Sequence, residues 1–182
     1  MNGEECLRQA YDAIFQGDFE SAIRSFAQAI ELEPDNAEYY YRGSITCARS
    51  GKTNLAVAYA RKAVELNPNE SSYVLNLRTI QCKERIVQAK ELLERNEPDI
   101  ERSAVLLLEA VRLDPLSAEA KLLLGIVFRV QGDFRKAIES LQDALLIEPA
   151  LEEAKRLLSE IRSERRRLLK QQYSHYHSKR NR

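Results

Sequence analysis

The chain has 182 residues, with 28 Lys and Arg against 28 Asp and Glu, so its formal net charge is zero. This length suffices for one domain with a sizeable core. The equal numbers of acidic and basic residues exclude a chain that is a polyelectrolyte over its whole length. The charge is unevenly placed, because residues 162–182 hold eight basic residues and one acid, which leaves −7 on residues 1–161. The sequence therefore predicts an acidic body followed by a basic tail.

Cysteine usage and hydropathy indicate an intracellular helical protein. Cys6, Cys47 and Cys82 are widely spaced and form no CxxC pair, so neither a zinc site nor a redox motif is expected. Three free thiols fit a reducing compartment, and we expect a cytoplasmic or nuclear location. The N-terminal residues MNGEECLRQA lack the apolar core of a signal peptide, and no stretch approaches the ~18 apolar residues of a membrane span. With six Gly and five Pro, the chain is predicted to be all-α.

Four prolines set a period along the chain. Pro34 and Pro68 are 34 residues apart, Pro115 and Pro149 are again 34 apart, and the middle pair is separated by 47. The residue five positions before each proline is alanine in every case: Ala29, Ala63, Ala110 and Ala144. The residue twelve positions before is also small: Ala22, Ala56, Ser103 and Ala137. A helical chain with this period and this pattern of small residues resembles the tetratricopeptide repeat (TPR) family.

The resemblance implies a TPR α-solenoid of about four helix pairs within residues 1–161. Its repeats are expected over about 3–36, 37–70, 71–117 and 118–151. Small residues belong where the second helix of a pair crosses the first closely, since larger side chains there would force the helices apart. The sequence QGDF occurs at 16–19 and again at 131–134. Its Gly is expected to end the first helix of a pair, and its Asp to cap the second.

The third repeat is irregular, because it contains 13 extra residues. Residues 71–95 contain no Gly or Pro, which permits one long helix. At about 100° per residue, the apolar side chains change face along it. They fall into a first set, Tyr73, Leu77 and Ile80, and a nearly opposite set, Cys82, Ile86, Ala89 and Leu93. One long helix is favoured, and a split near residues 81–85 is the alternative.

Residues after Pro149 carry a helical apolar stripe that predicts a capping helix over 150–172, of the kind such arrays need to cover their last repeat. Residues 173–182 are expected to be a disordered basic tail. The basic residues singled out in this region are Arg165, Arg166, Arg167, Lys170, Lys179 and Arg180. Together with Tyr173 and Tyr176, they suggest an alternative function, binding of nucleic acid or of an acidic surface. A solvated helix end with no binding role is favoured over this alternative.

The TPR resemblance also implies a binding groove lined by the first helix of each pair. The residues at groove positions are Tyr41, Arg42, Ile45 and Arg49 in the second repeat, Leu122, Leu123, Ile126 and Arg129 in the fourth, and Leu7, Tyr11 and Ile14 in the first. Tyr and Arg are common anchors of protein interfaces. The groove suits an apolar helix or peptide that carries some acidic residues. We therefore expect a scaffold or adaptor that binds partner proteins within an intracellular complex.

Two further activities are not expected. TPR co-chaperones of Hsp70 and Hsp90 hold a C-terminal carboxylate with a set of Lys, Asn and Arg residues. The matching positions here are Leu7, Tyr11, Arg42, Ser72 and Asn76, and none carries the family residue, so such a clamp is not predicted. The sequence has no phosphate loop, no glycine-rich nucleotide motif and no metal-ligand spacing, and its histidines, His175 and His177, lie in the tail. No enzyme activity, cofactor or metal is therefore expected.

Overall fold

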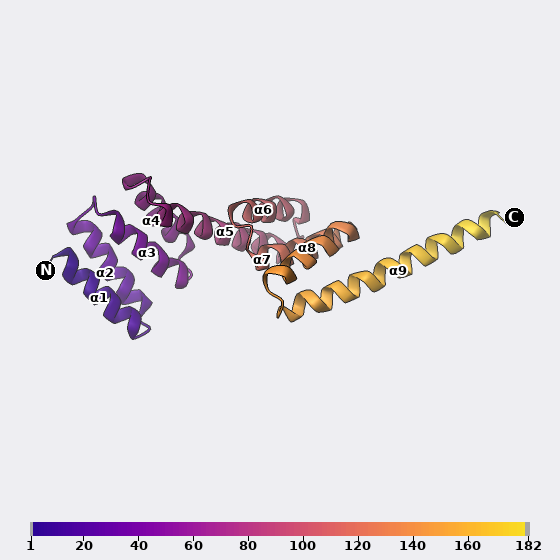
Figure 1. Ribbon diagram of the computed structural model, residues 1–182, viewed down its shortest axis with the longest axis horizontal. Coiled ribbons are helices and arrows are strands. Elements are labelled where there is room, and N and C mark those ends of the chain that lie inside the picture. The colour runs from indigo at the N-terminus through magenta and orange to yellow at the C-terminus, as the bar shows by residue number, and fades with distance from the viewer. Residues whose placement is uncertain (1, 181–182) are drawn as a thin grey trace. The chain divides into compact units, whose positions relative to one another are not determined.

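The computed structural model describes the backbone of residues 2–180 and the side chains of residues 2–171. The described backbone is helical and contains no strand. The helices in chain order are α1 (Gly3–Phe15), α2 (Phe19–Leu32), α3 (Ala37–Arg49), α4 (Thr53–Leu66), α5 (Ser71–Leu93), α6 (Ile100–Leu113), α7 (Ala118–Val130), α8 (Phe134–Ile147) and α9 (Glu152–Arg180) (Figure 1). The predicted all-α class is confirmed.

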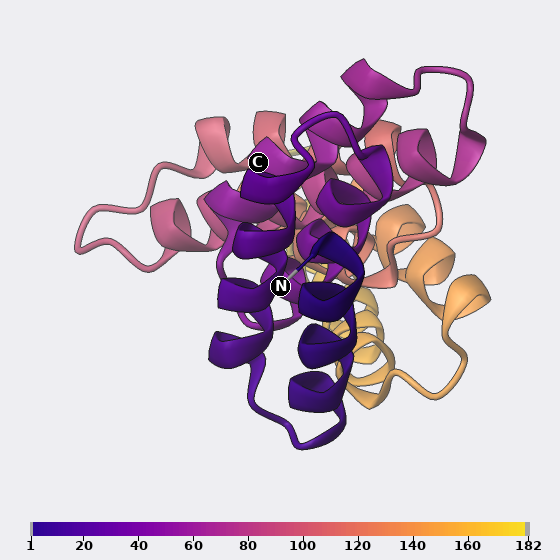
Figure 2. The same cartoon turned by 90° about the vertical axis from the view of Figure 1, so that its left-hand side faces the viewer.

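The chain divides into two compact units, which we call the N-terminal unit (Met1–Glu84) and the C-terminal unit (Arg85–Arg182). The N-terminal unit holds α1 to α4 and the first part of α5. Within it, α1 and α2 pack side by side, as do α3 and α4 (Figures 1 and 2). The C-terminal unit holds the remainder of α5 and α6 to α9, and α8 packs against both α7 and α9.

The turns inside the helix pairs follow the predicted chemistry. Gly17, Gly51 and Gly132 have φ of 78°, 78° and 77°, in the left-handed region that a glycine enters without steric cost. Asp18 and Asp133 then cap α2 and α8, because each carboxylate accepts a backbone N–H from three residues ahead at 3.0 Å. The two copies of QGDF are therefore structural turns.

The predicted small residues lie at the centre of the packing. Both sets, at twelve and at five positions before the prolines, are fully buried: Ala22, Ala56, Ser103, Ala137, Ala29, Ala63, Ala110 and Ala144. The one polar member, Ser103, donates its hydroxyl to the carbonyl of Asp99 at 2.7 Å. The hydroxyl is thus satisfied inside the core, where an unpaired polar group would be costly.

Helix α5 is continuous from Ser71 to Leu93, so the long helix is confirmed over the split one. Its first part buries Tyr73 and Ile80 in the N-terminal unit. Its second part buries Ile86, Ala89 and Leu92 in the C-terminal unit. Leu92 takes the place predicted for Leu93, which is only half-buried at the last position of the helix.

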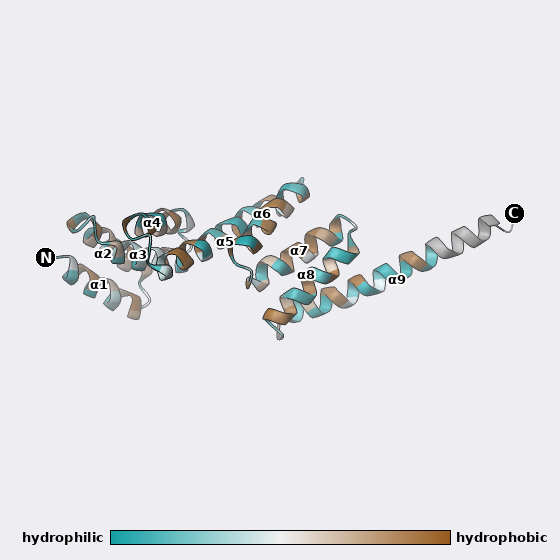
Figure 3. Cartoon of the chain, turned by 45° about the horizontal axis from the view of Figure 1, so that its top comes forward, coloured by the Kyte–Doolittle hydropathy of each residue, from teal (hydrophilic) through white to brown (hydrophobic). Residues whose placement is uncertain are grey.

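Helix α9 is longer than predicted, because its helical backbone continues past residue 172 to Arg180. No Gly or Pro occurs between Glu152 and Arg180 to stop it. In the coloured part of α9 in Figure 3, hydrophobic residues recur among hydrophilic ones. The predictions for Lys179, Arg180 and the tail tyrosines concern side chains outside the described residues. Within the described part of the chain, no helix is long and apolar enough to cross a membrane.

A substitution at Gly125 of α7 can test how closely the paired helices α7 and α8 pack. A Cβ at this position would stand 2.6 Å from the Cγ of Leu141, which is fully buried in α8. We expect Gly125→Ala to lower the free energy of unfolding by about 1–3 kcal/mol, because the added methyl group overpacks the crossing. Urea denaturation monitored by circular dichroism measures the change.

The same substitution in a Leu141→Ala background provides the control. With Leu141 truncated, the methyl group has room, and alanine is a better helix former than glycine by about 1 kcal/mol. Gly125→Ala should then be neutral or stabilising. An equal loss of stability in both backgrounds would contradict the packing explanation.

Candidate functional site

The first helices of the N-terminal unit bring together the side chains predicted for a groove. Tyr11 of α1 is 39% exposed, and the guanidinium of Arg42 on α3 lies 5.4 Å from the centre of its ring. Arg42 also donates to the carboxylate of Glu38, one helical turn earlier. A cation over an aromatic face is attracted by the ring's negative charge density. The charge of Arg42 is therefore already compensated within the unit.

Glu38 connects this group to α5. The hydroxyl of Tyr73 donates to the Oε2 of Glu38 at 3.1 Å, and the Tyr73 ring lies 4.7 Å from that of Tyr41 at an angle of 31°. Burial, and next the hydrogen bond to Glu38, raise the pKa of Tyr73 above its ordinary value. Tyr41 and Arg42 thus hold α1, α3 and α5 together as well as lining their common face.

A second polar contact joins the same helices. Asn76 of α5 donates its side-chain amide to the Oγ of Ser44 at 2.8 Å, and that hydroxyl donates to the carbonyl of Tyr41 at 2.6 Å. Ser44 is fully buried. The carboxylate-clamp position at Asn76 is therefore occupied by a contact inside the unit, and the prediction that no such clamp is present stays a prediction.

The end of α1 exposes an aromatic residue that sequence reasoning missed. Phe15 is 94% exposed, and it lies four residues after Tyr11, on the same side of the helix. It also stands 34 residues before Arg49, at the same position of its repeat. Arg49 is exposed, and its guanidinium lies 5.2 Å from the centre of the Phe19 ring. Applying the 34-residue period to Arg49 would have found Phe15.

We call the surface formed by Tyr11, Phe15, Arg42 and Arg49 the α1–α3 face. Ile45, also predicted for the groove, is half-buried on α3. Among the described residues Arg49 has no acidic partner, whereas Arg42 is paired with Glu38. The surface therefore offers two partly or fully exposed rings and one uncompensated guanidinium.

The predicted groove residues of the fourth repeat have a different environment. Leu122 is only 7% exposed, so it belongs to the core of the C-terminal unit, and Leu123 and Ile126 are half-buried. The guanidinium of Arg129 donates to Glu160 at 3.0 Å and to Glu164 at 3.1 Å, both on α9. Arg129 thus ties the capping helix to α7. These positions form no open surface like the α1–α3 face.

Cys6, Cys47 and Cys82 are all buried. Burial raises the pKa of the Cys47 thiol to about 11, so the reactive thiolate is rare near neutral pH. Within the described residues, no cluster of three or more His, Cys, Asp and Glu is arranged to hold a metal ion.

Comparisons with known proteins agree with this architecture. Residues 6–148 match the family described as the cilia and flagella-associated protein 70 middle TPR-like domain. The human protein SGT1 homolog is 38% identical over 64 residues, which cover 35% of this chain and 18% of the relative. Human serine/threonine-protein phosphatase 5 is 41% identical over 64 residues, covering 35% of this chain and 13% of the relative. The chain thus spans a fifth or less of these relatives.

Solved structures show the same fold. MamA from Desulfovibrio magneticus RS-1 superposes with a TM-score of 0.55 at 21% identity, covering 90% of this chain and 85% of that one. The predicted TPR family and solenoid fold are confirmed. The chain belongs to the family of the middle TPR-like domain of cilia and flagella-associated protein 70. Repeat solenoids of this kind generally serve as protein-interaction surfaces.

The raised pKa of Cys47 predicts a loss of stability at high pH. The unfolded thiol ionises near its ordinary pKa of 9.0, and the folded thiol near 11. As the pH rises, the thiol therefore loses its proton in the unfolded state before it does so in the folded state. The contribution of the protonated thiol to the stability of the fold is complete below about pH 9 and is lost as the pH rises to about 11. We expect Cys47→Ala to lessen this loss by on the order of 2 kcal/mol.

Urea denaturation of the wild type and of Cys47→Ala, at several pH values from about 8 to about 11, measures how the free energy of unfolding of each depends on pH. The cavity left by Cys47→Ala shifts the whole stability curve but not its slope, and the tyrosines titrate in both proteins. Two parallel curves over this range would show that the Cys47 thiol ionises equally in the folded and unfolded states.

Proposed function

We propose that the N-terminal unit is a scaffold module that binds a helix or extended segment of a partner protein along the α1–α3 face. The observation that carries the proposal is the 94% exposure of Phe15, one helical turn after the partly exposed Tyr11 on α1. Burying a phenylalanine side chain contributes roughly 1.5–3 kcal/mol. A partner that covers Phe15 would bury this side chain, and the free energy of burial would contribute to binding.

The charges of the face indicate the chemistry of the partner. Arg42 is compensated by Glu38, so a partner acid gains little there. Arg49 stacks on Phe19 and has no acidic partner in the described part of the unit. We therefore expect an apolar side chain of the partner against Phe15 and a carboxylate within reach of Arg49. Tyr41 and Ile45, which are half-buried next to this surface, would complete the contact.

The family name suggests where such partners occur. Because the matching family is named for cilia and flagella, we propose that the partner belongs to a ciliary or flagellar assembly. In this proposal the chain acts as an adaptor inside an intracellular complex. It uses no carboxylate clamp for Hsp70 or Hsp90, since the partly buried Leu7 packs against the cluster that contains Cys6 and Asn76 is bonded to Ser44.

The double variant Phe15→Ser/Arg49→Glu tests the proposal. Both residues are exposed, so the fold should survive, whereas changing Arg42 would also release Glu38. We expect recovery of the main partner by affinity capture and quantitative mass spectrometry to fall roughly tenfold, as for loss of an interface anchor.

A matched control is Leu32→Ser/Arg61→Glu, which makes the same kinds of change at exposed residues of α2 and α4. Thermal unfolding of both variants checks that they fold alike. Equal capture of every partner by the wild type, the variant and the control would exclude the α1–α3 face as the binding site.

A further inference from the structure

Residues 162–170 of α9, which we call the basic segment, carry an uncompensated positive charge. Five exposed basic side chains occur in it: Arg162, Arg165, Arg166, Arg167 and Lys170. Its one acid, Glu164, is engaged with Arg129 of α7, and no acidic residue follows it in the sequence. In the described part of the chain, none of the five has an acidic partner.

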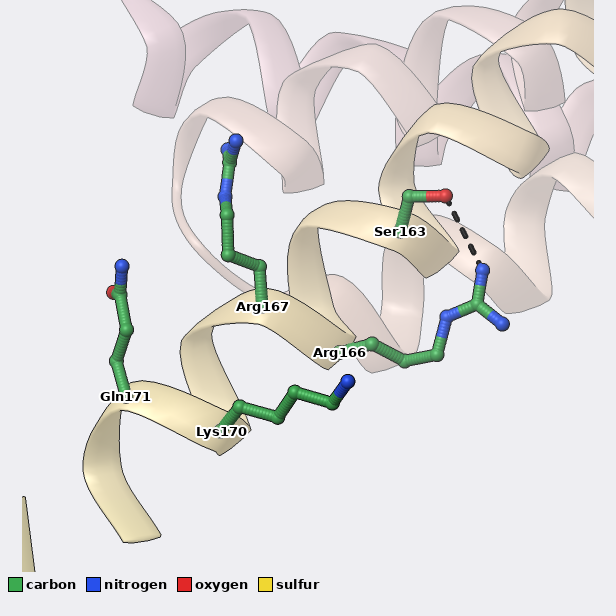
Figure 4. A pocket seen from close by; sticks show the side chains of 5 residues that line it. All are labelled: Ser163, Arg166, Arg167, Lys170 and Gln171. Carbon is green, nitrogen blue, oxygen red and sulfur yellow. Dashed lines mark hydrogen bonds between the residues drawn. The ribbon is translucent and has the colours of Figure 1, made fainter. Parts of the chain in front are cut away.

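The arrangement of these cations does not stabilise the helix. Arg162 and Arg166 are four residues apart, as are Arg166 and Lys170, and like charges at this spacing weaken a helix. Figure 4 shows Arg167 and Gln171 directed to one side of α9 and Arg166 and Lys170 to another, with Arg166 donating to Ser163. Positively charged side chains are therefore exposed on more than one side of α9.

An apolar surface lies among the cations. A cavity of about 250 Å³ is lined by Ile138 of α8 and by Arg162, Arg165, Arg166 and Leu169 of α9. The buried stripe that packs α9 within the unit ends at Ile161. Beyond it, Leu168 and Leu169 are 38% and 54% exposed. Guanidinium groups thus surround an uncovered aliphatic surface.

We propose that the basic segment binds an acidic segment of another protein that carries aliphatic side chains. One Leu or Ile side chain of the partner enters the cavity against Ile138 and Leu169. Carboxylates beside it accept hydrogen bonds from Arg162, Arg165 and Arg166, a pairing that the planar guanidinium group favours. This surface is on the C-terminal unit, so the inference does not depend on the α1–α3 face.

The other two candidate occupants fit less well. A nucleic acid would satisfy the guanidinium groups with phosphates but has no aliphatic side chain to cover Leu169. Among the side chains that the structure describes, no aromatic ring for base stacking lines this cavity. The same segment of a second copy carries the same positive charge, and facing like charges oppose association. Charge and apolar surface together select an acidic, aliphatic protein segment.

The test uses the full chain and three labelled probes in fluorescence anisotropy. The first probe is a designed helical peptide with leucines at i, i+3, i+4 spacing and glutamates elsewhere. The second replaces its glutamates with glutamines, and the third is an oligothymidylate. We expect the acidic peptide to bind, the glutamine peptide to bind at least about tenfold more weakly, and added salt to weaken binding.

Variants then separate charge from apolar contact. Arg162→Gln/Arg165→Gln/Arg166→Gln should weaken acidic-peptide binding roughly tenfold or more, and Leu169→Gln roughly threefold or more. Two control changes, Arg156→Gln on α9 and Leu146→Gln on α8, alter exposed residues away from the cavity and should leave binding unchanged. Phe15→Ser/Arg49→Glu should also leave it unchanged.

Three outcomes would overturn the proposal. The first is no measurable binding of the acidic peptide at low salt. The second is tighter binding of oligothymidylate that is insensitive to Leu169→Gln, which would assign the segment to nucleic acid. The third is a dimer in analytical ultracentrifugation that the triple arginine variant dissolves, which would assign the segment to self-association.

Discussion

The absence of side-chain volume where paired helices cross is the constraint on which the other features depend. At the α7–α8 crossing, Gly125 leaves room for Leu141, and Ala137 and Ala144 are fully buried beside it. Larger residues at these points would separate the helices and expose the apolar side chains between them. Close crossing also fixes the rotation of each helix, and so decides which of its side chains remain on the surface.

Fixed helix rotation explains the make-up of the α1–α3 face. Cys6, Ala10 and Ala13 occupy the packed side of α1, which leaves Tyr11 and Phe15 on the opposite side. On α3, burial of Gly43 and Cys47 similarly leaves Arg49 exposed and Arg42 half-buried. The contacts of Arg42 with Tyr11 and with Glu38, and of Glu38 with Tyr73, then connect α1, α3 and α5, so the surface that a partner would meet is already ordered.

Much of this architecture could be predicted from the sequence because its causes are local and periodic. The left-handed glycines, the capping aspartates and the buried alanines recur at the same places in the 34-residue period. The environment of individual site residues could not be predicted in the same way. The ion pairs of Arg129 depend on acids more than thirty residues away on α9, and the burial of Leu122 depends on packing against other helices. The sequence does not predict an exposed Phe15, because a phenylalanine in an amphipathic helix is usually a core residue.

The position of the basic segment follows from the same packing constraint. Five cations within nine residues could not lie at a helix crossing, because their desolvation would exceed any gain from packing. The apolar stripe of α9 through Ile161 packs within the C-terminal unit, and the segment begins at the next residue. Beyond Ile161 the described part of the helix buries no apolar stripe, so its side chains are not restricted to the small or apolar types that close helix packing requires. Leu168 and Leu169 lie among these cations and are 38% and 54% exposed. The proposed acidic, aliphatic partner segment would cover both kinds of side chain at once.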